Sequence, residues 1–407
     1  MSSLPRILPY DVIADIVDII ACPTTPSSIC NLKLISLVNT MFLHHCRKYL
    51  FGSISLDLGV WDTKHLDCFV VLINNHPHIA NYVRELCFTT INKKYEISPE
   101  QRSAFMKLSN LKTLTLCSKE LTAFDRLKWR VNWRLLESST RSMFVDLIQS
   151  PTLANLVLNN VTNFNVFHLL PRTALETLSL VYFGCPDLEG NPQMLDLYGH
   201  VRVKEINVDC DSLHDADGML KTTISRPSMI LDFEYLKTLK FRFTEKRSAI
   251  ALEMFRHAKN LNSVCLYLEK PDDIHFISKC VMPSIETLTS LKIVLQDEGE
   301  DQTWIPLREQ LDLLSKVKNG HNIKDLELVV VCKYNVPESD WHLLERILLK
   351  SGWTSTLRRF TLRIHVKIDP KISFVVPCDT LRKLFLPKLA ALESAEAFKT
   401  IFDLTCD

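Results

Sequence analysis

Glycine is scarce in this chain, with 9 residues among 407. Phosphate-binding loops and tight hairpin turns depend on glycine, because its backbone reaches positive φ angles without steric cost. The sequence also lacks the glycine-rich nucleotide-binding motifs, the nucleophile-elbow motif and the paired-histidine motif of zinc proteases. We therefore expect a protein that is not an enzyme and holds no cofactor. An unrecognised hydrolase or transferase is the alternative from the enzyme class.

An excess of charge of one sign is also missing. Lys and Arg total 48 against 47 Asp and Glu, which leaves a formal net charge of +1. Proteins that bind nucleic acid or anionic membranes usually carry a clear basic excess. The balance therefore gives no reason to expect either as the main partner.

Long hydrophobic runs are missing as well. No run reaches the ~18 apolar residues of a membrane span. The apolar stretch at residues 12–22 is interrupted by Asp15 and Asp18 and lacks the basic leader of a secretory signal. We expect a protein of the cytoplasm, the nucleus or both, with no membrane partner.

The 13 cysteines form no recognisable framework. No two of them stand at C-x-x-C spacing, and several lie inside apolar runs. This scatter is typical of reduced thiols in a reducing compartment. His44, His45 and Cys46 are adjacent, but neighbouring residues rarely bind one ion, and we expect no metal site.

The first fifty residues carry two apolar series that favour helices. Pro9 suits a first helical turn because its φ angle is already fixed. The apolar residues that follow make one helical stripe of Val12, Ile13, Ile16, Val17 and Ile20.

A loop at residues 23–28, with Ser28 as a candidate N-cap, is expected to separate that helix from two short helices within residues 32–51. The region has more apolar residues than such small helices bury among themselves. A partner protein or the next domain is expected to cover the surplus.

These residues resemble the F-box, a helical module that binds an adaptor protein. In that family a Leu-Pro pair and an acidic residue precede two aliphatics, as in LPYDVI at residues 8–13. An aliphatic-Ser-Leu-Val stretch follows, here residues 35–38, and then an aromatic residue. That aromatic is Phe42, where tryptophan is more usual, and the ending CRKYLF at residues 46–51 resembles divergent fungal F-boxes. The resemblance covers residues 4–52.

The resemblance implies that this module docks on a Skp-family adaptor and, through it, on the cullin scaffold of an SCF-type ubiquitin ligase. The implied adaptor contacts are Leu8, Pro9, Val12, Ile13, Ile16, Leu34, Leu37, Val38 and Phe42. The alternative is a helical cap that only shields the end of the following domain.

A loose repeat runs through the rest of the chain. The pattern aliphatic-x-x-aliphatic-x-aliphatic starts at residues 83, 111, 153, 175, 203, 236, 261, 288, 323, 357 and 381. Residues 54–58 are a degenerate first copy, and the mean spacing is about 30 residues. Each copy predicts a short strand whose aliphatic side chains point to one side.

Helical patterns lie between several copies, at residues 139–148, 248–257, 307–317 and 341–349. Stacked strand–helix units make a parallel sheet with helices on its other side. The predicted fold class is therefore α/β, with a small N-terminal helical module followed at residues 53–407 by an irregular solenoid, its strands concave and its helices convex.

This solenoid resembles a leucine-rich-repeat array. It departs from that family because Lys119, Val161, Phe183, Thr244, Glu269 and Leu389 stand where Asn or Cys usually closes each turn. Regular curvature is therefore not expected. Segments near residues 117–150 and 184–199 are predicted to be inserts or long loops.

The residues between the aliphatics are expected to form the concave face, and their charges alternate in sign. Such a mixed surface suits a protein partner better than nucleic acid. The predicted substrate contacts are Glu205, Asp209, Lys240, Arg242, Tyr267, Glu327, Arg359 and Arg363. The alternative is that this face is only solvated and that loops bind the partner.

A basic and aromatic cluster occupies residues 126–134, with Trp129 and Trp133. Such a cluster stacks on nucleobases or holds a phosphorylated partner in other proteins, or its tryptophans pack on the solenoid. Taken together, the sequence predicts a substrate-recognition subunit of an SCF-type ubiquitin ligase. The alternative is a repeat-based interaction scaffold without a ligase role.

Overall fold

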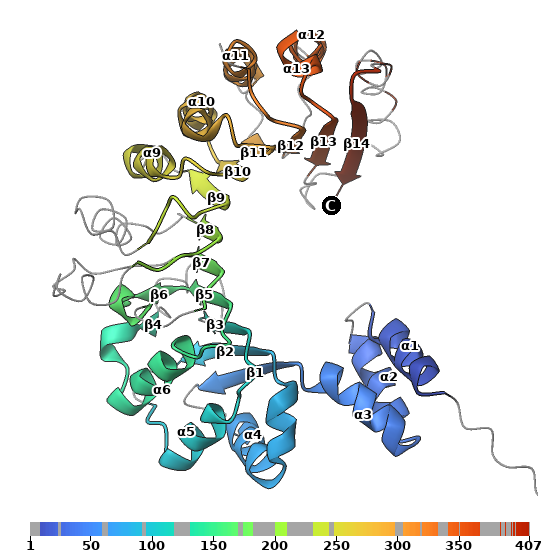
Figure 1. Cartoon of the computed structure of the whole chain (residues 1–407), viewed down its shortest axis with the longest axis vertical. Coiled ribbons are helices and arrows are strands. Elements are labelled where there is room, and N and C mark those ends of the chain that lie inside the picture. Colours follow the sequence, from blue (N-terminus) through green and yellow to red (C-terminus); the bar gives the residue numbers. More distant parts are fainter. Residues whose placement is uncertain are drawn as a thin grey trace, which may run out of the picture. The chain divides into compact units, whose positions relative to one another are not determined.

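The computed structural model of the chain has two compact units, Met1–Leu175 and Glu176–Asp407. The residues that the structure describes are 9–22, 26–58, 64–91, 95–117, 131–169, 174–181, 200–209, 231–243, 248–297, 304–317, 320–332, 341–349, 351–366 and 396–406, with 383, 387, 392 and 394. Twelve strands belong to one sheet in the order β1-β2-β3-β5-β7-β8-β9-β10-β11-β12-β13-β14 (Figure 1). The predicted α/β class with a parallel sheet and N-terminal helices is confirmed.

The first unit begins with a bundle of α1 (Tyr10–Ala21), α2 (Pro26–Ser36) and α3 (Thr40–Leu50). Pro9 stands at the N-cap of α1. The side chain of Asn39 caps α3 by accepting hydrogen bonds from the backbone N–H groups of Met41 and Phe42, both at 2.9 Å. The three helices were predicted, and Ser28, the candidate N-cap, lies two residues inside α2, which begins at Pro26.

Four parallel strands follow in the first unit. They are β1 (Ser53–Leu58), β2 (Glu85–Ile91), β3 (Thr113–Cys117) and β5 (Asn155–Asn159). The helices that connect them are α4 (Lys64–Asn75), η1 (Pro77–Tyr82), α5 (Pro99–Met106), η3 (Trp133–Leu135), α6 (Ser138–Ile148) and η4 (Val166–Leu169). The short strands β4 (Val131–Asn132) and β6 (Val161–Thr162) form a separate parallel pair.

The second unit continues the same alternation. Its strands are β7 (Thr177–Val181), β8 (Glu205–Asp209), β9 (Thr238–Phe243), β10 (Ser263–Leu268), β11 (Ser290–Asp297), β12 (Asp325–Cys332), β13 (Arg359–Val366) and β14 (Lys399–Cys406). Its helices are α9 (Ser248–His257), η6 (Pro271–Phe276), α10 (Ile277–Val281), η7 (Met282–Ser284), α11 (Trp304–Ser315), α12 (Trp341–Leu348) and α13 (Ser351–Thr354). Figure 1 shows α9 to α13 on one side of the strands.

The aliphatic pattern sets which face of each strand is buried. Leu114 and Leu116 of β3, for example, are fully buried, whereas Thr113 and Thr115 between them are half-buried. The same alternation holds in β5 and β9. We call the face that carries these intervening residues the polar face of a unit. The opposite, aliphatic face supplies the core.

Ten of the eleven predicted repeat motifs, and the degenerate copy at residues 54–58, coincide with strands. Of the motif that starts at residue 381 only Lys383 is described, and it is helical. The strand paired with β13 is β14. The helix predicted at residues 139–148, inside the segment near 117–150, is confirmed. This helix is α6, whose Met143, Phe144 and Leu147 are buried in the core. Residues 184–199 lie outside the described residues.

Candidate functional site

The helical bundle has a small core of its own. Ile13 and Val17 of α1, Leu32 of α2, and Phe42 and Cys46 of α3 are buried against one another. These side chains hold the three helices together, so they are not available to a partner. Ile13 and Phe42, two of the predicted adaptor contacts, therefore lie in the bundle core.

Four other predicted adaptor contacts belong to α1 or precede it. Ile16 is half-buried and packs against the bundle core. Pro9 and Val12 are exposed at the start of α1. Leu8 lies outside the described residues. Ile16 is therefore a poor test of partner binding, because a polar residue there would also weaken the core.

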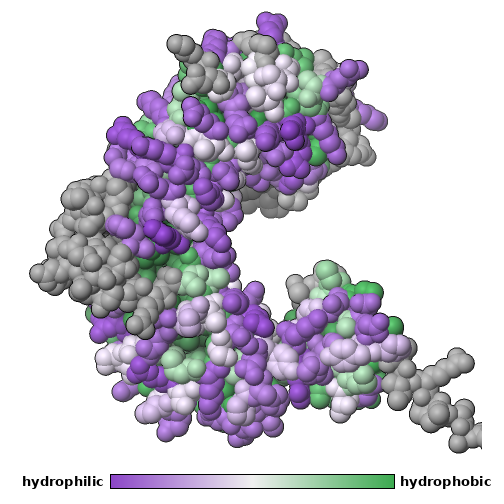
Figure 2. All heavy atoms as spheres, in the orientation of Figure 1, coloured by the Kyte–Doolittle hydropathy of each residue, from purple (hydrophilic) through white to green (hydrophobic). Residues whose placement is uncertain are grey.

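Three aliphatic side chains at the end of α2 are strongly exposed. Leu34 is 66%, Leu37 82% and Val38 67% exposed. We call them the α2-end patch. Their backbones turn tightly here, since the N–H of Leu37 donates to the carbonyl of Leu34 at 3.1 Å. Apolar residues show as green patches on the bundle surface in Figure 2.

Two exposed aliphatics of the bundle were not predicted as contacts. Ile19 on α1 is 72% exposed, and Ile29 on α2 is 45% exposed. At about 100° per residue, Ile19 lies on the same side of α1 as the exposed Val12 and away from the core residues Ile13 and Val17. Only the packing of α2 and α3 decides which side of α1 is covered.

Polar contacts fix α1 against α3. The carboxylate of Asp18 accepts hydrogen bonds from Lys48 Nζ at 2.8 Å and from the hydroxyl of Tyr49 at 2.7 Å. These two hydrogen bonds hold the pKa of the Asp18 carboxyl below its usual value. The interaction lies at the surface and contributes modestly to the stability of the bundle.

The bundle joins the sheet through Gly52. A Cβ atom at this position would collide with the backbone oxygen of Lys48. The Gly52 carbonyl accepts hydrogen bonds from the N–H groups of Arg84 and Glu85, at 2.8 and 2.9 Å. A second contact joins the hydroxyl of Tyr82 to His44 Nδ1 at 3.3 Å. Glycine at 52 therefore lets the chain leave α3 and enter the sheet directly.

The strand register shows which side chains are neighbours on the polar face of the second unit. Successive strands place their intervening residues in rows across the sheet. One row contains Glu205, Thr238, Ser263, Ser290, Asp325 and Arg359. The next contains Ser179, Asn207, Lys240, Cys265, Lys292, Glu327 and Thr361.

The charged residues in these rows form ion pairs between neighbouring strands. Lys240 Nζ lies 2.6 Å from Glu205 Oε1, and Arg359 Nε lies 2.9 Å from Asp325 Oδ1. Glu205, Lys240 and Arg359 were predicted to line this face. The structure brings them together as pairs within the chain.

A three-residue cluster is centred on Glu327 of β12. Its Oε1 atom lies 3.0 Å from Lys292 Nζ on β11 and 3.3 Å from Arg363 Nε on β13. All three side chains are partly exposed. One carboxylate thus serves two cations, which leaves a local positive excess beside Glu327.

Arg242 and Tyr267 lie together at the next row. The guanidinium carbon of Arg242 is 5.7 Å from the Tyr267 ring centroid, and its Nη1 atom is 3.6 Å from Glu269 Oε1. Val294 and Val329 continue the row from Tyr267 towards Arg363. The predicted contact Asp209 pairs with Val181 in the sheet register, and only its backbone is described.

The polar face of the first unit has a different composition. Its described positions hold mainly hydroxyl, amide and thiol side chains, namely Ser53, Ser55, Thr113, Thr115, Asn155, Asn159, Cys87 and Cys117, with Asp57 and Glu85 as charged residues. The side-chain amide of Asn155 donates to the Thr113 hydroxyl at 3.1 Å. The sulfur atoms of Cys87 and Cys117 are 3.8 Å apart.

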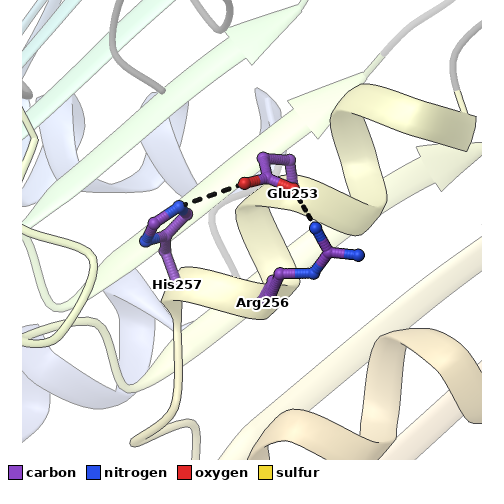
Figure 3. A network of polar contacts seen from close by, with 3 residues as sticks. All are labelled: Glu253, Arg256 and His257. Carbon is purple, nitrogen blue, oxygen red and sulfur yellow. Dashed lines mark hydrogen bonds and ion pairs between the residues drawn. The ribbon is translucent and has the colours of Figure 1, made fainter. Parts of the chain in front are cut away.

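A polar network also lies on the helical side of the second unit. On α9, Glu253 accepts from Arg256 at 2.7 Å and contacts His257 Nε2 at 3.3 Å (Figure 3). These residues are three and four positions apart on one helix. Such pairs stabilise a helix by ~0.2–0.5 kcal/mol. This network is explained by helix stability alone.

Of the two tryptophans in the basic and aromatic cluster, Trp133 packs inside the protein. It is 1% exposed and packs its ring against Phe164, with centroids 4.8 Å apart. Its ring is therefore part of the core and is not presented to a ligand. Trp129 and the rest of the cluster up to residue 130 lie outside the described residues.

No family model matches the sequence, and no curated protein matches it. None of the described helices is long and apolar enough to cross a membrane. Within the same residues, no three or more His, Cys, Asp or Glu side chains gather as metal ligands would.

Proposed function

We propose that this chain is the substrate-recognition subunit of an SCF-type ubiquitin ligase. In this proposal the N-terminal bundle docks on a Skp-family adaptor, and the polar face of the second unit holds a protein substrate. Ubiquitin transfer belongs to the other subunits. The chain would accelerate it by raising the effective concentration of substrate lysines near the enzyme.

The α2-end patch is the observation that carries the adaptor part. Leu34, Leu37 and Val38 stay exposed although the bundle core is already complete. Burying one such side chain contributes ~1.5–3 kcal/mol. Together they provide enough apolar surface to anchor a partner helix or groove.

The second unit supports the substrate part through its mixed charge. Its acidic and basic side chains are held in fixed positions by ion pairs such as Lys240–Glu205. A protein partner with the complementary order of charges would be selected over others, because a wrong order places like charges together. Tyr267 supplies an aromatic contact of the kind that anchors protein interfaces.

The adaptor part is tested by coexpressing the chain with a Skp-family adaptor and measuring affinity. We expect Leu37→Glu to weaken binding by at least ~30-fold, equivalent to ~2 kcal/mol. The matched control is Val71→Glu on α4, which changes a 57% exposed aliphatic outside the bundle. It should bind as the wild type does.

Two results would contradict the proposal. Equal binding by Leu37→Glu and wild type would remove the α2-end patch from the interface. Absence of binding by the wild-type chain would favour the alternative, in which the bundle caps a scaffold protein and has no ligase role. Thermal melting of both variants would confirm that they remain folded.

A further inference from the structure

The starts of the last three strands carry a group of basic side chains. Lys324 directly precedes β12, Arg358 directly precedes β13, and Lys399 is the first residue of β14. Arg358 and Lys399 are exposed, and Lys324 is half-buried. We call these three residues the basic rim. Figure 1 shows their strands as neighbours in the second unit.

Backbone hydrogen bonds hold the rim residues close together. The carbonyl of Lys324 accepts from the N–H of Arg358 at 2.8 Å, and the carbonyl of Arg358 accepts from the N–H of Lys399 at 2.8 Å. Neighbouring strands are ~4.8 Å apart, so the three backbones lie within about 10 Å of one another. Their long side chains can therefore reach one ligand together.

Little negative charge balances this group. Asp325, next to Lys324, is held by Arg359 at 2.9 Å. Among the described residues, none of the three rim side chains forms an ion pair. With Arg359 included, the starts of β12, β13 and β14 thus hold four cations against the single carboxylate of Asp325.

The equivalent positions before earlier strands of the second unit are different. Lys204, which precedes β8, lies 2.6 Å from Glu176, so its charge is compensated. Asn262 and Thr289, which precede β10 and β11, are neutral. Lys237, before β9, is a single exposed cation. Among these described strand starts, a group of neighbouring cations therefore occurs only at the last three strands.

A short anionic segment fits this group better than a long polyanion. Nucleic acid requires a basic track that follows many successive phosphates. On the same face, the rim is followed by the carboxylates of Glu327 and Asp403, which would repel such a chain. The formal net charge of +1 for the whole chain adds no long-range attraction to nucleic acid or anionic lipid. A protein segment can place carboxylates at the rim and neutral residues elsewhere.

We propose that the basic rim binds an acidic segment of a partner protein, in which two or more Asp or Glu side chains lie within a few consecutive residues. This inference rests on the substrate part of the proposed function and narrows it to acidic substrates. Alternate side chains of an extended segment are ~6.6 Å apart, so two carboxylates can each meet a different rim cation. Each contact is exposed and weakened by salt, so the cations act together.

The test uses the full-length chain and a short fluorescein-labelled peptide of alternating glutamate and serine. Fluorescence anisotropy measures its affinity at ~0.15 M ionic strength, where the Debye length is ~8 Å. We expect Arg358→Glu and Lys399→Glu each to weaken binding by at least ~3-fold, and the double variant by at least ~10-fold.

The matched control is Lys237→Glu. It makes the same change of charge at the same position of another repeat, three strands or ~14 Å away from Lys324. This distance exceeds the Debye length, so the variant should bind the peptide as the wild type does.

A second peptide, with glutamine in place of glutamate, should not bind. The inference is overturned if both peptides bind equally, or if the double variant binds the acidic peptide as tightly as the wild type. Tighter binding of a single-stranded oligonucleotide or of phosphatidylserine vesicles, lost in the double variant, would also overturn it. Adaptor binding is measured separately with Leu37→Glu, so failure of the ligase proposal and failure of this inference give different results.

Discussion

The two units use the same strand–helix alternation but carry very different polar faces. The first unit presents mainly hydroxyl, amide and thiol groups, including Cys87 and Cys117, whose sulfur atoms are 3.8 Å apart. The second presents charges that are joined across neighbouring strands, such as Arg359 with Asp325. The repeat therefore fixes the aliphatic side only. The polar side differs in composition, with mainly uncharged polar groups in the first unit and paired charges in the second.

The largest effect is expected from acid, acting on His321 in the second unit. Burial lowers the pKa of this histidine to about 4, and its ring lies 4.3 Å from that of Trp353. Below its unfolded pKa the unfolded chain takes up a proton that the native state refuses. Stability is therefore complete near neutral pH and falls as the pH drops, by ~2 kcal/mol at about pH 5.

This loss is measured by urea denaturation at neutral pH and at about pH 5, with tryptophan fluorescence as the signal. His321→Gln should flatten the pH dependence of the second unit. An unchanged dependence in that variant would show that another group is responsible. His168 in the first unit, whose pKa burial also lowers, provides the corresponding measurement there.

The next effect concerns Glu327, the carboxylate shared by Lys292 and Arg363. Glu327→Gln leaves two cations close together without their anion. We expect a loss of ~1 kcal/mol in unfolding free energy, since all three side chains are partly exposed. Glu85→Gln, on the polar face of the first unit, is the matched control and should cost less. Equal losses would mean that the two faces do not differ electrostatically.

Salt should have a smaller effect, which is to change the unfolding free energy lost in Glu327→Gln but not that lost in Glu85→Gln. The ion pairs of the second unit are screened when the ionic strength rises, with a Debye length of ~3 Å at 1 M. We expect NaCl to reduce the extra cost of Glu327→Gln and to leave Glu85→Gln unaffected. Chemical denaturation with urea, an uncharged denaturant, measures both.

The smallest effect is expected at the bundle, where Asp18 contacts Lys48 and Tyr49. The lowered pKa of Asp18 means that its contribution is present above its unfolded pKa and lost as the pH falls through the folded one. Asp18→Asn should lower bundle stability by ~0.2–1 kcal/mol, because the group is exposed. Hydrogen exchange of α1 amides at neutral pH is the suitable readout, and unchanged protection would contradict the prediction.

The strands were predictable because the aliphatic pattern repeats with a period of two residues within each strand, which matches a half-buried sheet. The last strand was missed for a physical reason. In β14 the polar Thr400 occupies a position that is aliphatic in most other strands, and the better motif nearby begins at residue 381. The pattern therefore gave no reason to predict a strand at residues 399–406.

The candidate sites were less predictable than the fold. Mixed charge on the second unit could be read from the sequence, but the pairing of Glu327 with two cations depends on register across three strands. The proximity of Cys87 and Cys117 depends on a diagonal contact between residues 30 apart. The exposure of Leu37 rather than Ile13 depends on how three helices rotate against one another.

The core of the first unit contains a chain of aromatic rings that crosses several repeats. Phe105 of α5 packs against Phe88 of β2, Phe88 against Phe144 of α6, and Phe144 against Trp133, with centroids 5.6, 5.0 and 6.1 Å apart. Trp133 in turn meets Phe164. Repeat proteins often unfold one repeat at a time, because each contacts only its neighbours. These rings couple the repeats, so the first unit should melt cooperatively, in a single transition.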